Sequence, residues 1–76
     1  MVTGGVATAA APVDALSERE RTVLRYLATA LSYREIAEEL YVSINTVKTH
    51  VKNVIRKLGV GSRAEAVARA RELGYL

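Results

Sequence analysis

The chain has 76 residues, of which 50% are hydrophobic and 25% charged, and its formal net charge is +3. This length allows one small domain with a modest core. The absence of cysteine excludes disulfides and thiolate zinc sites, and a single histidine excludes a His-rich metal cluster.

Residues 1–15 are typical of a tail or linker, because they contain small residues, two adjacent glycines and a proline without helical periodicity. The longest uncharged stretch, Met1–Val13, is too short to span a bilayer, and no Lys or Arg precedes Arg19. We therefore expect a soluble, cytoplasmic protein with no membrane partner, whose folded domain covers residues 16–76.

Serine N-caps predict four helices, at about 18–30, 33–41, 44–58 and 63–73. Three of the serines open capping boxes of the form Ser-x-x-Glu, which pair Ser17 with Glu20, Ser32 with Glu35, and Ser62 with Glu65. Ser43 caps the third helix, and Gly59 follows its end. The apolar positions at helical spacing are Val23, Leu24, Leu27 and Ala28; Ile36, Ala37 and Leu40; Val47, Val51, Val54, Ile55 and Leu58; and Val67, Ala70 and Leu73.

The third helix is rich in β-branched residues, which taken alone could indicate a strand. The serine cap, the terminal glycine and the three-and-four spacing of its apolar residues outweigh that signal. The predicted fold class is therefore all-α, a four-helix bundle.

The charge is unevenly distributed. Residues 1–39 carry four Arg against six acids, whereas residues 40–64 carry five basic residues and no acid, which are Lys48, Lys52, Arg56, Lys57 and Arg63. We call these five residues the basic block. Such a block inside a folded domain is expected of a polyanion binder, although a merely solvated basic face is the alternative on charge alone.

The second and third predicted helices are joined by two or three residues around Tyr41-Val42-Ser43, which describes a helix-turn-helix. On a helical wheel, a polar stripe free of acids spans about 100° of the third helix, away from the core. It contains Asn45, Lys48, Thr49, Lys52 and Arg56, with Asn53 at its edge. Lys can bind guanine, Asn adenine and Thr the thymine methyl group, so this stripe has the chemistry needed to read DNA bases.

The sequence resembles the LuxR/GerE-type helix-turn-helix domain over residues 16–76. The resemblance rests on Leu16-Ser17-x-Arg19-Glu20-x-x-Val23-Leu24, Ile36-Ala37-x-x-Leu40, Val42-Ser43-x-x-Thr46-Val47-Lys48-Thr49-His50, Lys57-Leu58-Gly59-Val60, Arg63 and Ala66-Val67. Within this family, the segment 45–53 and the ending 70–74 look most like C-terminal domains of the MalT type, with a response-regulator transcription factor as the alternative.

The resemblance implies the output domain of a bacterial transcriptional regulator that binds double-stranded DNA sequence-specifically through its third helix. The residues it implies for base reading are Lys48, Thr49 and Lys52, with Asn45 and Asn53 nearby. Those it implies for phosphate contact are Ser32, Tyr33, Arg34, Thr46 and Arg56 or Lys57. It also implies a homodimer formed partly by the fourth helix, whose candidate surface residues Val67, Ala70, Arg71 and Leu73 are equally consistent with core, and a contact with RNA polymerase is a further candidate.

The sequence departs from the family pattern at two positions, having Ala30 where Gly is common and Tyr33 where Asn is common. If residue 30 must adopt a left-handed conformation, Ala would cost about 1 kcal/mol there. His50 lies about 150° from the centre of the polar stripe, which favours a boundary position over base contact.

We interpret Tyr26, Tyr41 and Tyr75 as aromatics at the core boundary rather than base-stacking platforms, because they are scattered over different elements. Arg19 and Glu20 are interpreted as scaffold.

An enzyme is not expected, because the sequence has no paired carboxylates, no nucleophile with a base and no Gly-rich phosphate loop. No cofactor, metal or small-molecule ligand is predicted for this domain either. A helical protein-interaction module remains the alternative class. A salt titration of DNA binding would distinguish it from a DNA-binding domain. The linker-like start favours a C-terminal domain excised from a longer regulator over a stand-alone member.

Overall fold

The computed structural model describes residues 16–76, which form four α-helices and no strand. The helices are α3 (Glu18–Leu27), α4 (Tyr33–Leu40), α5 (Ile44–Leu58) and α6 (Arg63–Glu72). All four predicted helices are thus confirmed, and both ends of α5 agree with the prediction. The predicted tail, residues 1–15, lies outside the described residues.

Serine caps begin the helices as predicted, with one correction. Ser17 and Ser32 each form a full capping box, in which the serine hydroxyl accepts from the backbone N–H of the glutamate three residues on, and that glutamate accepts from the serine N–H. At α6, Ser62 Oγ accepts from the Glu65 N–H at 3.2 Å, but Glu65 Oε1 accepts from the N–H of Gly61 at 2.7 Å. The φ of Ser62 is −154°, against −72° and −74° at the other two boxes, which places its N–H differently. The third box is therefore only half formed.

Helix α3 ends at Leu27 rather than at residue 30, so its predicted end was wrong by three residues. The Thr29 hydroxyl donates to the Tyr26 carbonyl and accepts from the Leu31 N–H, and such local side-chain bonds compete with continuation of a helix. Ala30 is not left-handed, because Tyr41 is the one non-glycine residue with positive φ in 16–76. The strain considered for Ala30 therefore does not arise.

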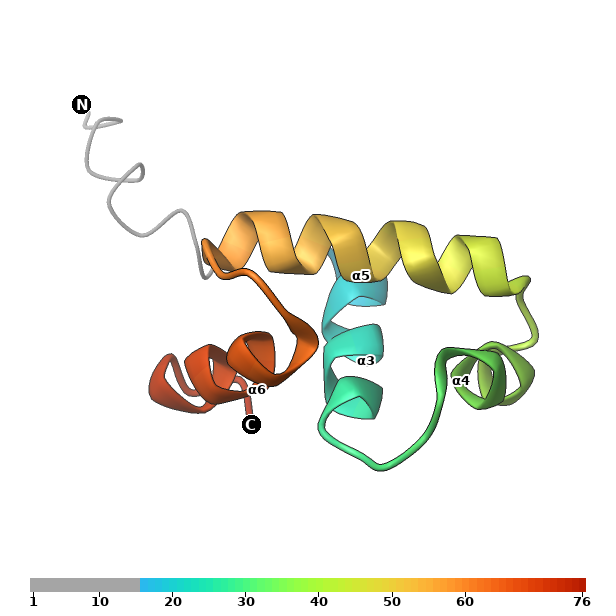
Figure 1. Cartoon of the computed structure of the whole chain (residues 1–76), viewed down its shortest axis with the longest axis horizontal. Coiled ribbons are helices and arrows are strands. Elements are labelled where there is room, and N and C mark those ends of the chain that lie inside the picture. The colour runs from blue at the N-terminus through green and yellow to red at the C-terminus, as the bar shows by residue number, and fades with distance from the viewer. Residues whose placement is uncertain (1–15) are drawn as a thin grey trace.

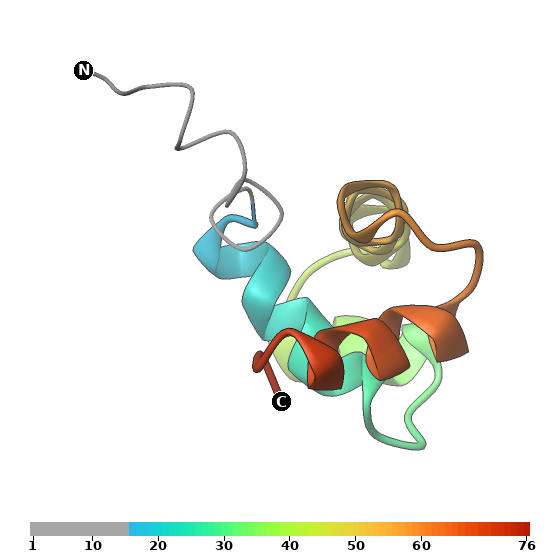
Figure 2. The same cartoon turned by 90° about the vertical axis from the view of Figure 1, so that its left-hand side faces the viewer.

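The long helix α5 lies along one side of the domain. The other three helices all pack against its inner face (Figure 1). Figure 2 shows α5 end-on, with α3, α4 and α6 gathered below it. The buried apolar residues come from every helix: Leu16, Val23, Leu24, Leu27, Ile36, Ala37, Val47, Val51, Val54, Leu58, Ala66 and Ala70. One face of α5 packs against the other helices, and its other face is not covered by any helix of residues 16–76.

Burial corrects one further expectation, for Tyr41, and decides between the two alternatives left open for Ala70. Tyr41 is 94% exposed and is therefore not a core-boundary aromatic, whereas Tyr26 and Tyr75 are partly buried against the core as predicted. Ala70 is completely buried, so it belongs to the core of the domain and offers no surface to a dimer partner. No helix in residues 16–76 is long and apolar enough to cross a membrane.

Candidate nucleic-acid interface

A tight turn joins α4 to α5. Tyr41 ends α4 in the left-handed conformation, with φ 58° and ψ 43°. This lets the Val42 N–H bond back to the Ala37 carbonyl at 3.1 Å, so the chain changes direction between the two helices within a few residues. Ser43 Oγ then accepts from the Thr46 N–H at 3.1 Å, so α5 begins at once. The predicted helix-turn-helix is present in the structure.

The outward face of α5 carries the predicted polar stripe. Its members Asn45, Lys48, Thr49, Lys52 and Arg56 are all exposed. The residues of α5 that are buried, Val47, Val51, Val54 and Leu58, belong to the core. Helical phase therefore separates a continuous surface of donors, acceptors and cations from the packing face, as the sequence predicted.

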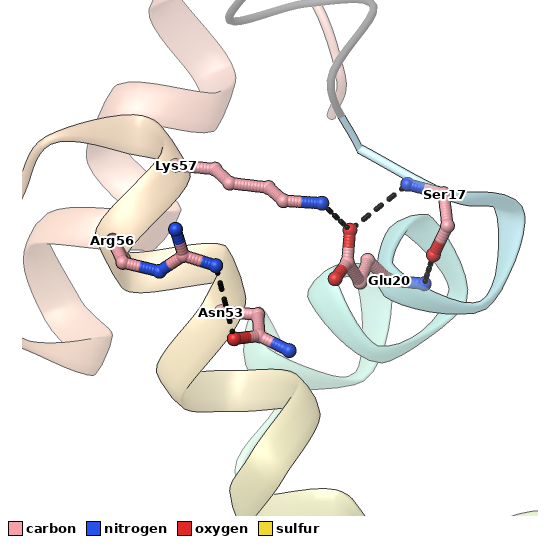
Figure 3. Close-up of polar contacts among 5 residues, drawn as sticks. All are labelled: Ser17, Glu20, Asn53, Arg56 and Lys57. Atoms are coloured by element: carbon pink, nitrogen blue, oxygen red, sulfur yellow. Dashed lines mark hydrogen bonds and ion pairs between the residues drawn. The ribbon is translucent and has the colours of Figure 1, made fainter.

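Asn53 and Arg56 are paired at the edge of this stripe (Figure 3). Arg56 Nη2 donates to Asn53 Oδ1 at 3.3 Å. A guanidinium has only donors, so the amide oxygen of Asn53 must face it. The amide NH₂ of Asn53 is then the group left to face a ligand.

The start of α4 holds the other predicted phosphate contacts. Ser32 and Arg34 are exposed, whereas Tyr33 is half-buried with its ring centroid 5.5 Å from the Arg63 guanidinium carbon. Thr46 is half-buried at the start of α5, where its hydroxyl lies 2.9 Å from that of Ser43. These residues lie at the first turns of two helices, where free N–H groups and the positive ends of the helix dipoles favour anions.

Lys57 turns inward, which removes the basis for its expected phosphate contact. Its Nζ lies 2.8 Å from Oε1 of Glu20, a carboxylate that also accepts from the Ser17 N–H at 2.9 Å (Figure 3). Burial raises the pKa of Glu20, but the hydrogen bonds from Lys57 and Ser17 and the charge of Lys57 outweigh it, so the pKa is lowered. Of the two expected alternatives, Arg56 alone stays on the exposed face. The interpretation of Glu20 as scaffold is confirmed.

Arg63 also turns inward, a role that the sequence analysis missed. Its guanidinium donates to the carbonyls of Leu27, Thr29 and Leu31. His50 is half-buried, and its Nδ1 is buried without a hydrogen-bond partner, which confirms its boundary position outside the stripe. No short-range pattern distinguishes Arg63 from the outward cations, because its partners lie more than 30 residues away in the sequence.

The family model described as "Bacterial regulatory proteins, luxR family" matches residues 14–70. The chain belongs to this family. It is 51% identical over 55 residues to the nitrate/nitrite response regulator protein homolog of Haemophilus influenzae, covering 72% of this chain and 26% of that protein. It is 53% identical over 68 residues to the probable transcriptional regulatory protein NarL of Mycobacterium tuberculosis, covering 88% and 32%.

Two solved structures resemble the fold. The transcription factor GerE superposes with a TM-score of 0.75 at 38% identity, covering 80% of this chain and 91% of that one. The response regulator ChrA of a heme-sensing two-component system gives a TM-score of 0.77 at 34% identity, covering 100% of this chain and 40% of that one.

These similarities confirm the resemblance noted in the sequence and the all-α LuxR-type fold. The chain is a DNA-binding helix-turn-helix domain of the kind found in regulators of the luxR family. It spans about a quarter to a third of the length of the two curated relatives named above. Of the two likenesses considered within the family, the similar proteins support the one to response-regulator transcription factors, whereas the likeness to the MalT type stays an untested prediction.

Proposed function

We propose that this domain binds double-stranded DNA sequence-specifically by placing α5 in the major groove. The observation that carries the proposal is the outward face of α5, which is exposed, free of acids and cationic. No ion pair within residues 16–76 engages Lys48 or Lys52. Because an α-helix fits the major groove of B-DNA, both ammonium groups can reach base edges.

Lys48, Thr49 and Lys52 are the central base-reading residues of this proposal. Lysine ammonium groups donate to O6 and N7 of guanine, and the threonine methyl group packs on that of thymine. Asn45, at the start of the helix, can pair with adenine through both ends of its amide. Asn53 differs, since Arg56 occupies its oxygen, so its NH₂ would donate to guanine or thymine acceptors.

Phosphate contacts would come from the flanks of this stripe. Ser32, Tyr33 and Arg34 begin α4, Thr46 lies in the first turn of α5, and Arg56 lies towards its far end. Contacts of this kind set the orientation of the protein and add affinity for any duplex, without reading sequence.

In its wider setting, the domain would act in the cytoplasm, at the nucleoid, as the output part of a regulator. It would bind as a homodimer to two half-sites and could meet RNA polymerase beside them. Support for a dimer surface on α6 is limited to Arg71, which is exposed, and to Val67 and Leu73, which are half-buried.

A salt titration on duplexes selected from a random pool tests the proposal. For each phosphate that the protein neutralises, the log–log slope of affinity against salt is about −0.9. For the wild type we expect a slope that corresponds to several neutralised phosphates. Two half-sites at a fixed spacing in the selected sequences would indicate that the domain binds as a dimer. Affinity for duplex DNA that hardly changes with salt would overturn the proposal in favour of a protein-interaction module.

A further inference from the structure

Arg63, the first residue of α6, binds the loop that joins α3 to α4. Its Nε donates to the Leu27 carbonyl at 3.1 Å, and its Nη2 donates to the carbonyls of Thr29 at 2.9 Å and Leu31 at 2.7 Å. The last carbonyls of a helix have no partner within the helix, so such a donor stabilises the end of α3. Figure 2 shows the start of α6 beside this loop.

The same guanidinium also reaches the first residue of α4. Its central carbon lies 5.5 Å from the ring centroid of Tyr33, which is within the range of a cation–π interaction. Arg63 therefore holds the chain on both sides of Ser32, the N-cap of α4. Lysine cannot replace this arrangement, because its ammonium is a single point charge without the planar fork of donors.

The contact with Arg63 links the start of α4 to α6. Helix α4 packs against α5, and Figure 1 shows α4 and α6 at opposite ends of the domain with α3 between them. The other polar bonds of the loop, those of Thr29 with Tyr26 and Leu31, are local and exposed. Among the hydrogen bonds of residues 28–31, those from Arg63 are the ones that tie the loop to a distant helix.

We propose that Arg63 is a positioning residue for DNA binding: it holds the first turn of α4 where Ser32, Tyr33 and Arg34 can reach a phosphate. The inference rests on the proposed function. In this proposal Arg63 does not contact DNA itself. Its role therefore differs from that of Lys48 and Lys52, although all three belong to the basic block.

Arg63→Lys in the full chain tests the inference, because it keeps the charge and removes the three-carbonyl contact. We expect affinity to fall about fivefold for selected and scrambled duplexes alike, with a salt slope smaller by about 0.9, as for the loss of one phosphate contact. Arg69→Lys is the matched control, since Arg69 lies on the same helix, is exposed and pairs with its neighbour Glu72. It should change affinity by less than about twofold.

Double-mutant cycles locate the effect. If Arg63 acts through α4, Arg63→Lys combined with Arg34→Ala should lose less than the sum of the single losses, whereas Arg63→Lys and Lys48→Ala should add. Full additivity with Arg34→Ala, or a change of less than about twofold for Arg63→Lys, would overturn the inference. A loss confined to the selected duplex would overturn it as well, because that loss would point to the base-reading face.

Amide hydrogen exchange gives a readout that needs no DNA. In Arg63→Lys, exchange should accelerate over residues 28–36 and stay unchanged in the middle of α5. A uniform acceleration would mean that Arg63 supports the whole domain, which overturns a positioning role. If the wild type fails the salt titration while this local change is present, the proposed function fails and Arg63 positions α4 for another purpose.

Discussion

Two regions of the domain use the same basic block in opposite ways. On the outward face of α5, Lys48 and Lys52 are exposed and have no acid near them in the sequence. The second region, which we call the polar seam, consists of Lys57 and Arg63 with their partners on α3 and the following loop. Both of these cations are hydrogen-bonded to protein groups. Whether a cation stays available to a ligand or stabilises the fold therefore depends on which element packs opposite it.

Helical phase explains most of the difference. Lys57 follows Val54 by three residues and therefore lies on the side of α5 that faces α3, where the buried carboxylate of Glu20 neutralises it. Lys48 and Lys52 lie four residues apart on the opposite side. Of the five charges of the basic block, those of Lys48, Lys52 and Arg56 are therefore the ones that a polyanion on the outward face of α5 would meet.

The largest expected effect is on DNA binding through the outward face. Lys48→Ala or Lys52→Ala should weaken binding to the selected duplex by about 1–3 kcal/mol, because a base contact is lost. Stability should change by less than about 0.5 kcal/mol, since both side chains are exposed. Fluorescence anisotropy with selected and scrambled duplexes measures the first effect, and urea unfolding the second. Equal losses on both duplexes would contradict a base-reading role.

The seam should show the reverse pattern. Glu20→Gln should lower the free energy of unfolding by about 1–2 kcal/mol, because the hydrogen bonds that residue 20 accepts are then no longer charge-assisted, and should change DNA affinity by less than about twofold. The lowered pKa of Glu20 means that its contribution is complete above about pH 4.3 and is lost as pH falls through the lower pKa of the folded state. The unfolding free energies of wild type and variant, measured in urea, should therefore converge as pH falls through the lowered pKa of Glu20. If the difference in unfolding free energy between wild type and variant stayed constant as pH falls, the charge of Glu20 would not be the source of its stabilising effect.

Tyr41 lies neither on the outward face of α5 nor in the polar seam, so its substitution should change stability without changing DNA binding. Tyr41→Asn should stabilise the domain by about 0.5–1 kcal/mol, since Asn tolerates the left-handed conformation better and the exposed ring loses little packing. Thermal unfolding measures the gain, and Gly59→Ala, at the other left-handed position, should destabilise instead. If Tyr41→Asn raised DNA affinity along with stability, DNA binding and stability would not depend on separate sets of residues.

The smallest expected effect concerns Arg56, on the outward face close to the seam. Arg56→Gln should weaken binding to all duplexes by less than about 1 kcal/mol and reduce the salt slope by about 0.9. It should also broaden base preference next to Asn53, whose amide is then free to reverse. Selection from a random pool with both proteins measures the preference. An unchanged salt slope would exclude a phosphate contact by Arg56.

The sequence alone determined the helices and the outward face. The start of each helix depends on a serine that bonds three residues ahead, and the end of α5 depends on Gly59, which adopts φ 72°. The exposure of Lys48 and Lys52 follows from helical period. These interactions lie within one or two turns, so the residues that make them stand close together in the sequence.

Only the tertiary structure decided which cations turn inward, where Tyr41 points and which alanines of α6 are buried. Lys57 and Glu20 are 37 residues apart in the sequence, and the nearest carbonyl partner of Arg63 is 32 residues away. Periodicity indicates which side of a helix faces protein, but the groups opposite that side come from another helix. The partner of a charge is therefore settled when the helices pack. Lys48, Lys52 and Arg56 are the members of the basic block that lie on the side of α5 against which no helix of residues 16–76 packs.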